Sequence, residues 1–501
     1  MPAQLTSMSS LSLFAPELVL SGAMAVLLVV DLLLRESPSK RRVLGVLAIG
    51  GLLLAGLALR PVACEAPTTF FSGMIALDPM AVFFKGFFVL VGILGVLLAL
   101  ISAELETVRI GEYLALILSL VLGMSLLASA SNLLMIYLSL ELVSIPSYVL
   151  AGFRKGDRQG SEGALKYVIY GAVASGIMLF GMSLIYGLSG TLDVQDLRRV
   201  VFAAASNPAI SAALLVGLML TLAGFLYKIA AVPFHMWCPD VYQGAPTPFT
   251  AFLSVGPKAA GFAILVRFFH VAFVDRSGAG AAAGLPWPVI FGIISMSTMT
   301  LANLVALTQT NVKRLLAWSS VAHAGYILMG FSLANSQGVH AILLYLILYL
   351  VMNLGAFLAV MAVRDATGSE DLSAYRGLSS RSPAVAISMA VFLFSLTGLP
   401  PLAGFIGKFY IFAAVLNEGG LFYYALALVG VVNSVVSLYY YALVVRAMFL
   451  ESAPAQSPRL AVSPAYVALL FTLVIPTVVL GIYWQPLSEL ASASLGLYIG
   501  R

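Results

Sequence analysis

Ionisable side chains occur deep within the apolar stretches of this sequence, where they indicate that ions or protons are transferred. The four deepest are Glu141, Lys228, Lys258 and Lys408. A charge at the centre of a bilayer costs about 3 kcal/mol, so such residues are rare in membrane spans and usually mark a path for ions or protons. Burial disfavours an ammonium ion and a nearby carboxylate favours it. We therefore interpret the four residues as a series of proton-transfer groups, with Glu141 and Lys228 as a pair.

Three further side chains could extend this series: Lys166, His235 and His323. A histidine suits a relay because its ordinary pKa is about 6.5. Each has a structural alternative, since a lysine near a span end can extend its amine to the lipid headgroups and a buried histidine can bond a backbone carbonyl. Lys85 and Arg267 also lie near span ends, and for these two we favour the headgroup interpretation.

Helix-disrupting residues adjoin the three deep lysines. They are Pro233, Pro257, Pro400 and Pro401. Proline removes a backbone donor and clashes with the carbonyl four residues before it. Irregular backbone is tolerated at membrane depth only against protein or a wet cavity. We therefore expect helix breaks at these prolines, each with free carbonyl groups beside a lysine.

The composition requires a membrane. Of the 501 residues, 61% are hydrophobic and 9% charged, against roughly 45–50% and about 25% in soluble domains. The chain lacks the charged residues that would cover a soluble enzyme of this length. Its net charge of +5 forms no basic patch suited to nucleic acid. The two cysteines, Cys64 and Cys238, are too few for a disulfide framework or a metal cluster.

Fourteen apolar stretches approach the length of about 20 residues that a helix needs to cross a bilayer. They lie at 13–34, 43–59, 80–102, 112–130, 132–153, 163–187, 209–231, 248–272, 287–308, 315–333, 338–363, 385–416, 422–449 and 462–484. We predict an all-α polytopic membrane protein with fourteen transmembrane helices, forming a single membrane domain over residues 1–501.

The positions of the expected breaks predict the internal symmetry. Helices 7 and 12 are both discontinuous, and their odd offset places them in opposite directions through the membrane, which is typical of an inverted repeat. We therefore predict two inverted five-helix repeats. Helices 1–3 lie at 1–110, repeat one (helices 4–8) at 111–272, repeat two (helices 9–13) at 287–449 and helix 14 at 462–484.

Basic residues concentrate on one side of this topology. If the N-terminus is outside, the inner loops hold fifteen basic residues and the outer segments five. Cytoplasmic loops have such an excess, so we predict that both termini face the outer side. Residues 193–205 form either a short amphipathic helix on the outer interface or an ordinary loop.

Three stretches give the sequence a family resemblance: Tyr227–Ala263 (YKIAAVPFHMWCPDVYQGAPTPFTAFLSVGPKAAGFA), Asn311–Gly330 (NVKRLLAWSSVAHAGYILMG) and Ser395–Phe412 (SLTGLPPLAGFIGKFYIF). With them, essentially the whole chain resembles the antiporter-like membrane subunits of respiratory complex I, the proton-translocating NADH:quinone oxidoreductase. Among these it is most similar to subunit N (chain 2). The lysine at position 408 resembles the residue that subunits N and L have at this place, whereas subunit M has a glutamate there.

The resemblance implies fourteen helices in inverted repeats and a subunit that moves protons without redox chemistry of its own, in a bacterial inner membrane with its termini on the periplasmic side. The residues to which it assigns function are Glu141, Lys228, Lys258 and Lys408, with Lys166 and His323 as additions. NADH oxidation and quinone reduction would drive it from partner subunits.

The chain has no Gly-x-Gly-x-x-Gly fingerprint in a strand–helix context and no set of cysteine ligands. We therefore expect no cofactor or metal in this chain, and NADH, FMN, iron–sulfur clusters and quinone in the other complex I subunits. Neighbouring antiporter-like and small membrane subunits, together with the lipid bilayer, would be its partners, and nucleic acid would not.

One alternative function is that of a Mrp-type cation/proton antiporter subunit, which shares the fold and the lysines. The other is a purely structural membrane arm, which the cost of buried lysines disfavours.

Overall fold

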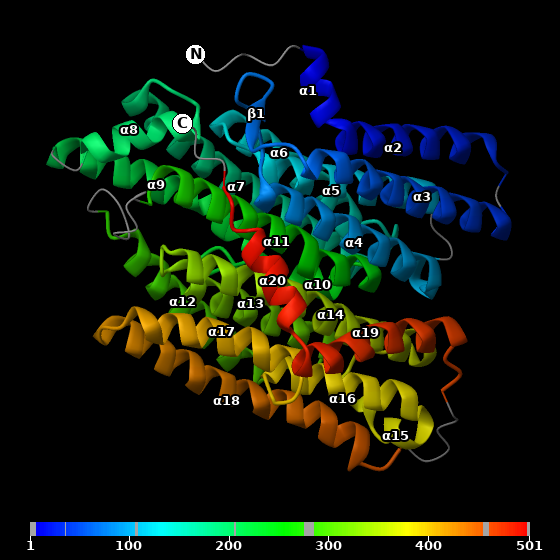
Figure 1. The fold of residues 1–501 in the computed structure, drawn as a ribbon. Coiled ribbons are helices and arrows are strands. Elements are labelled where there is room, and N and C mark those ends of the chain that lie inside the picture. The colour runs from blue at the N-terminus through cyan, green and yellow to red at the C-terminus, as the bar shows by residue number, and fades with distance from the viewer. Residues whose placement is uncertain are drawn as a thin grey trace.

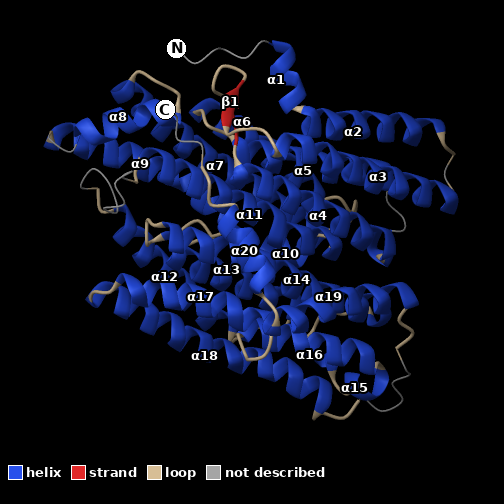
Figure 2. Ribbon diagram, in the orientation of Figure 1, coloured by secondary structure: helices blue, strands red, loops and turns tan. Residues whose placement is uncertain are grey.

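The protein is a stack of long, roughly parallel helices with one short β-hairpin (Figures 1 and 2). The computed structural model describes residues 7–35, 37–105, 109–204, 207–274, 285–453 and 460–497. Both chain ends, to which the orientation prediction refers, lie outside the described residues.

The N-terminal region forms one edge of the stack, from blue to light blue in Figure 1. Asp78 caps its last long helix by accepting a hydrogen bond from the backbone N–H of Ala81 at 2.8 Å, which satisfies a donor that the helix start leaves free. The elements are α1 (Ser7–Leu13), α2 (Ala15–Leu33), α3 (Pro38–Ala63), β1 (Thr68–Phe70), β2 (Ile75–Leu77), α4 (Pro79–Ile101) and a 3₁₀ turn (Ala103–Leu105).

The middle of the chain contains the first expected repeat. Its elements are α5 (Ile110–Ser129), α6 (Leu133–Ala151), α7 (Arg158–Ser189), α8 (Val194–Ala204), α9 (Pro208–Ile229), α10 (Trp237–Gly244) and α11 (Thr247–Ala272). Of the two alternatives for residues 193–205, the structure has the helix, as α8, with Ala205 outside the described residues. Arg198 of α8 donates to the backbone oxygen of Val274, just past the end of α11, at 2.7 Å.

In the last part of the chain, yellow and orange helices form the opposite edge of the stack in Figure 1, whereas the red C-terminal helix crosses the middle of the view. The elements of this part are α12 (Trp287–Ala306), α13 (Val312–Phe331), α14 (Ser336–Thr367), a 3₁₀ turn (Leu372–Tyr375), α15 (Leu378–Arg381), α16 (Pro383–Thr397), α17 (Ala403–Glu418), α18 (Leu421–Phe449), α19 (Pro464–Ile482) and α20 (Gln485–Ala493).

Twelve helices in the described ranges are long and apolar enough to cross a membrane, so the chain is a polytopic membrane protein. Two of the fourteen expected stretches are not among them. The tenth is α13, whose 20 residues are almost all buried, and the twelfth is divided into α16, with 15 residues, and α17, with 16.

The centre of the stack is α11. Every residue of this helix except His270 is buried, and most of α14 is buried as well. α11 packs against α4, α5, α9 and α14, which places it between the two halves of the chain. Any side chain at its middle is therefore shielded from lipid.

Two of the expected breaks are present. α9 ends at Ile229, where Ala230 adopts the left-handed region with φ +57°, and helix resumes only at Trp237. α16 ends at Thr397, where Gly398 has φ +93°, and α17 begins at Ala403. The breaks thus fall beside Pro233 and the pair Pro400–Pro401, as the sequence predicts.

The third expected break is absent, so the prediction for Pro257 is wrong. α11 runs without interruption through Pro257 from Thr247 to Ala272. A single proline removes one backbone hydrogen bond, and neighbouring helices can hold a transmembrane helix together around it. Because α11 is packed on all sides, this proline is accommodated within the helix.

Candidate functional site

Lys228 lies in the last turn of α9, next to the first break, and its side chain is 3% exposed. Its ammonium group donates to the hydroxyl of Ser144 on α6 at 3.1 Å. Glu141 lies one turn before Ser144 on the same helix. Both members of the expected Glu141–Lys228 pair therefore lie near the Ser144 hydroxyl.

Glu141 is half-buried. Its buried Oε1 atom accepts no hydrogen bond from any described residue. An ionised carboxylate oxygen without a donor is costly in an apolar region. This oxygen can therefore accept a proton or a water molecule, which suits an entry point to a proton path.

Lys258 lies in the middle of α11 and is buried. Its ammonium group donates to both the backbone oxygen and the hydroxyl oxygen of Ser320, each at 2.6 Å. The hydroxyl of Tyr349 on α14 also donates to the Ser320 hydroxyl oxygen, at 2.9 Å. The central lysine is therefore joined to α13 and α14, which belong to the second half of the chain.

His323 lies one turn after Ser320 on α13 and is buried. Its Nδ1 atom is 2.6 Å from the hydroxyl of Tyr345 on α14. The centre of its ring lies 5.7 Å from that of Tyr326, the ring over which the Lys408 ammonium lies. The histidine thus lies between two of the predicted lysines and contacts a hydroxyl group that can exchange protons.

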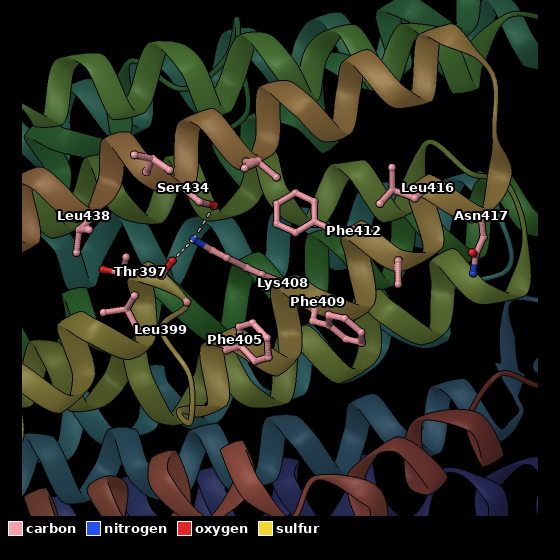
Figure 3. A pocket seen from close by; sticks show the side chains of 14 residues that line it. Thr397, Leu399, Phe405, Lys408, Phe409, Phe412, Leu416, Asn417, Ser434 and Leu438 are labelled. Carbon is pink, nitrogen blue, oxygen red and sulfur yellow. Dashed lines mark hydrogen bonds between the residues drawn. The ribbon is translucent and has the colours of Figure 1, made fainter.

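Lys408 lies in α17 after the second break (Figure 3). Its ammonium group donates to the backbone oxygen of Thr397, the last residue of α16, at 2.8 Å, and to the hydroxyl of Ser434 on α18 at 3.1 Å. It also lies 4.4 Å from the centre of the Tyr326 ring. The lysine therefore satisfies a carbonyl group that the break leaves free, as expected from the sequence.

A cavity of about 550 Å³ adjoins Lys408, between α17 and α18. Its wall is mainly apolar, as the side chains of Phe405, Phe409 and Phe412 in Figure 3 illustrate. Among the described residues that line it, Lys408 alone is charged. An ammonium group at the edge of an apolar space finds little solvation there, so its bonds to Thr397 and Ser434 supply its polar partners.

His235 lies in the break itself, and Lys166 lies apart from the deep residues. The His235 ring is buried and 5.8 Å from the ring of Trp318 on α13. Lys166 of α7 is 39% exposed and forms ion pairs with Glu162 at 2.8 Å and Asp240 at 2.7 Å. The structure therefore does not place Lys166 in contact with the buried series.

The headgroup interpretation of Lys85 and Arg267 is wrong. Lys85 is buried against Glu17 of α2, with 2.7 Å between Nζ and Oε1. The guanidinium of Arg267 forms two hydrogen bonds with the carboxylate of Asp78, at 2.7 and 2.8 Å. A carboxylate on a neighbouring element pairs each charge inside the protein, so neither side chain needs to reach the headgroups.

The hydroxyl groups around the lysines were not anticipated from the sequence. Ser144 lies three residues after Glu141, and Ser320 three residues before His323. Residues at this spacing share a helix face, so the serines could have been identified as neighbours of the ionisable residues. Tyr345 and Tyr349 are also one turn apart, on α14. No buried residue of this helix is charged, so there was no reason in the sequence to select these tyrosines.

In the part of the chain that the structure describes, no group of three His, Cys, Asp or Glu side chains could hold a metal ion. Cys64 is exposed and Cys238 is buried, and both are free thiols. The described titratable groups available for chemistry are buried lysines, two buried histidines, a half-buried glutamate and tyrosines. Such groups can transfer protons.

Comparison with known proteins shows which chains are similar to this one. Residues 130–437 match the family described as NADH:quinone oxidoreductase/Mrp antiporter, transmembrane. A protein of Anaeromyxobacter sp. (strain Fw109-5), named NADH-quinone oxidoreductase subunit N, is 50% identical over 505 residues, covering 97% of each chain. A chain in the structure of respiratory complex I from Thermus thermophilus with bound aureothin is 31% identical, with a TM-score of 0.76 over 95% of this chain and 99% of that one. A chain of the Mrp complex from Dietzia sp. DQ12-45-1b has the same fold, with 23% identity and a TM-score of 0.81 over 98% and 97% of the two chains.

Proposed function

The chain belongs to the NADH:quinone oxidoreductase/Mrp antiporter family, and from this premise we propose that it is a proton-translocating membrane subunit of an NADH:quinone oxidoreductase. NADH oxidation and quinone reduction occur in partner subunits, which hold the FMN, the iron–sulfur clusters and the quinone. This chain contributes the buried path and no redox step.

The observation that supports the proposal is the series of ionisable groups, buried except for the half-buried Glu141, across both halves of the chain. In order they are Glu141, Lys228, Lys258, His323 and Lys408. Each contacts a hydroxyl or carbonyl group, or carries a carboxylate oxygen with no donor. No hydrogen bond among the described residues joins one of these groups directly to the next. We propose that water molecules connect them, since a water can bridge two polar groups nearly as well as a direct bond.

The proposal includes the membrane layout. The chain crosses the membrane fourteen times, with α13 as the tenth crossing and the broken α16–α17 segment as the twelfth. Residues 111–272 and 287–449 form the two inverted repeats, within a single domain. The protein lies in a bacterial inner membrane with both termini on the periplasmic side, as the excess of basic residues in the inner loops supports.

A Mrp-type cation/proton antiporter subunit is the second candidate, because the fold is shared with the Mrp chain of Dietzia. A native gel of gently solubilised membranes separates the two functions. We expect the chain in a large band that stains for NADH dehydrogenase activity. Its presence only in bands without that activity, beside other small hydrophobic chains, would favour the antiporter, and sodium-dependent proton flux would then be measured.

Replacing Tyr345 with phenylalanine should slow proton pumping by about threefold to tenfold, because His323 loses its hydrogen-bonding partner. The measurement is proton uptake by inverted membrane vesicles during NADH oxidation. Tyr113→Phe is the matched control, since the Tyr113 hydroxyl is buried at the start of α5 and has no hydrogen-bond partner among the described residues. Equal pumping by the two variants would remove Tyr345 from the path.

A further inference from the structure

The short helix α10 connects the helices of two central lysines. It follows the break after Lys228 and precedes α11, which contains Lys258. The indole N–H of Trp237, at its start, donates to the backbone oxygen of Tyr227, next to Lys228, at 3.2 Å. The backbone oxygen of Tyr242, near its end, accepts a hydrogen bond from Thr250 of α11 at 3.0 Å. A shift of α10 would therefore move both lysine environments.

Asp240 of α10 receives one cation from each half of the chain. Its Oδ2 atom pairs with Lys166 of α7 at 2.7 Å, and its Oδ1 atom with Arg314 of α13 at 2.7 Å. Arg314 also donates to the side-chain oxygen of Gln243 at 2.9 Å, and Lys313 to the backbone oxygen of Ala245 at 2.7 Å. One carboxylate thus joins α7, α10 and α13.

Close packing holds α10 against α7 at the same place. A Cβ atom added at Gly163 would lie 3.1 Å from the backbone oxygen of Asp240, which is tighter than an ordinary contact. The ring of Tyr167 stacks on Trp237, with 4.3 Å between centroids and 18° between planes. α10 can therefore leave this position only by giving up both the stacking and the ion pairs.

The surroundings of Lys166 do not suit a group that must release its proton. Both of its ion-pair partners, Glu162 and Asp240, are carboxylates that favour the charged ammonium. The side chain is also well exposed, unlike the three deep lysines. Its contacts are those of a residue that holds α7 and α10 together through an ion pair.

We propose that Asp240 is a positioning residue that clamps α10 to both halves of the chain through Lys166 and Arg314, and so fixes Lys228 and Lys258 relative to each other. Lys166 acts in this clamp and not as a proton carrier. The inference rests on the proposed function, because it assigns the clamp to the proton path.

Two substitutions of Lys166 separate a clamp from a carrier. Arginine keeps the pairing with Asp240 but stays protonated at any physiological pH, so a clamp tolerates Lys166→Arg and a carrier does not. We expect Lys166→Arg to keep most of the pumping rate and Lys166→Met to lose about fivefold, since small misplacements of reacting groups are costly. If Lys166→Arg is as inactive as Lys166→Met, the proposal is wrong.

The position of α10 can be measured without any pumping, through the buried thiol of Cys238. Cys64→Ser removes the exposed thiol, and a small water-soluble thiol reagent is then applied to the assembled complex in inverted vesicles. We expect Asp240→Asn to raise the labelling rate of Cys238 by about tenfold, because a thiol reacts only when it is reached by the reagent. Lys166→Arg should label as slowly as the unsubstituted chain.

Glu162→Gln is the matched control, because Glu162 pairs with Lys166 but belongs to α7 and should leave α10 in place. Equal labelling of the Asp240→Asn and Glu162→Gln variants would overturn the clamp. If the Asp240→Asn variant does not accumulate, the pumping rates of Lys166→Arg and Lys166→Met decide whether the clamp exists. Normal pumping by Lys228→Ala would instead contradict the proposed function, and the labelling result would still report whether the clamp exists.

Discussion

Replacing Lys258 with methionine is expected to lower proton pumping by about tenfold or more, because positioned proton-transfer groups contribute at least that much to a rate. Lys258 is the ammonium at the middle of the buried α11, and its two bonds to Ser320 connect the halves of the chain. Methionine fills a similar space but holds no proton. Pumping and NADH oxidation would be measured together in inverted vesicles, with electron transfer from NADH to a soluble acceptor as the test of assembly.

Two further variants sharpen this result. Lys258→Arg keeps the charge but cannot release it, so we expect it to be as inactive as Lys258→Met if the residue transfers protons. Lys155→Met removes an exposed lysine in the loop before α7 and should pump normally. Pumping by Lys258→Arg at the rate of the unsubstituted chain would mean that Lys258 supplies only a fixed charge.

The burial of the ionisable residues could be predicted from the sequence alone. Three lysines lie deep within long apolar stretches, far from the membrane surface on either side: Lys228, Lys258 and Lys408. All three are buried in the structure. The breaks next to Lys228 and Lys408 were also predictable, because proline and glycine disfavour a continuous helix at these positions. The proton-transfer roles of these residues remain predictions that the variants test.

The partners of the charges could not be predicted, because they depend on which helices pack together. Asp240 is 74 residues from both Lys166 and Arg314, and Asp78 is 189 residues from Arg267. Spacing along one helix gives no information about contacts over such separations. For the same reason the sequence suggested headgroup contacts for Arg267, although a carboxylate lies directly beside it.

Whether the helix breaks at Pro257 could not be predicted from the local sequence. Its local pattern, a glycine and a proline before a lysine, is as disruptive as those at the true breaks. Whether a helix bends or breaks there depends on the neighbours that hold it, and α11 is surrounded by helices on all sides. The packing of the whole protein therefore overrides the local preference.

Replacing Arg267 with methionine should strongly reduce the amount of assembled protein. The substitution leaves the carboxylate of Asp78 buried without its guanidinium partner, and breaking a buried pair in this way costs about 3–5 kcal/mol. Such a loss is a large fraction of the stability of a typical domain, about 5–15 kcal/mol. The measurement is the amount of this chain in the native complex, together with the temperature at which the solubilised complex dissociates.

A double variant tests the reason for this loss. Asp78→Asn removes the stranded charge but keeps an oxygen that can accept the N–H of Ala81, and asparagine is a good helix cap. Arg267→Met combined with Asp78→Asn should therefore assemble better than Arg267→Met alone. Arg199→Met is the control, because Arg199 is 86% exposed and should not affect assembly. A double variant that assembles worse than the single one would show that Arg267 stabilises the fold through contacts other than the Asp78 charge, such as its hydrogen bond to the backbone oxygen of Ala128.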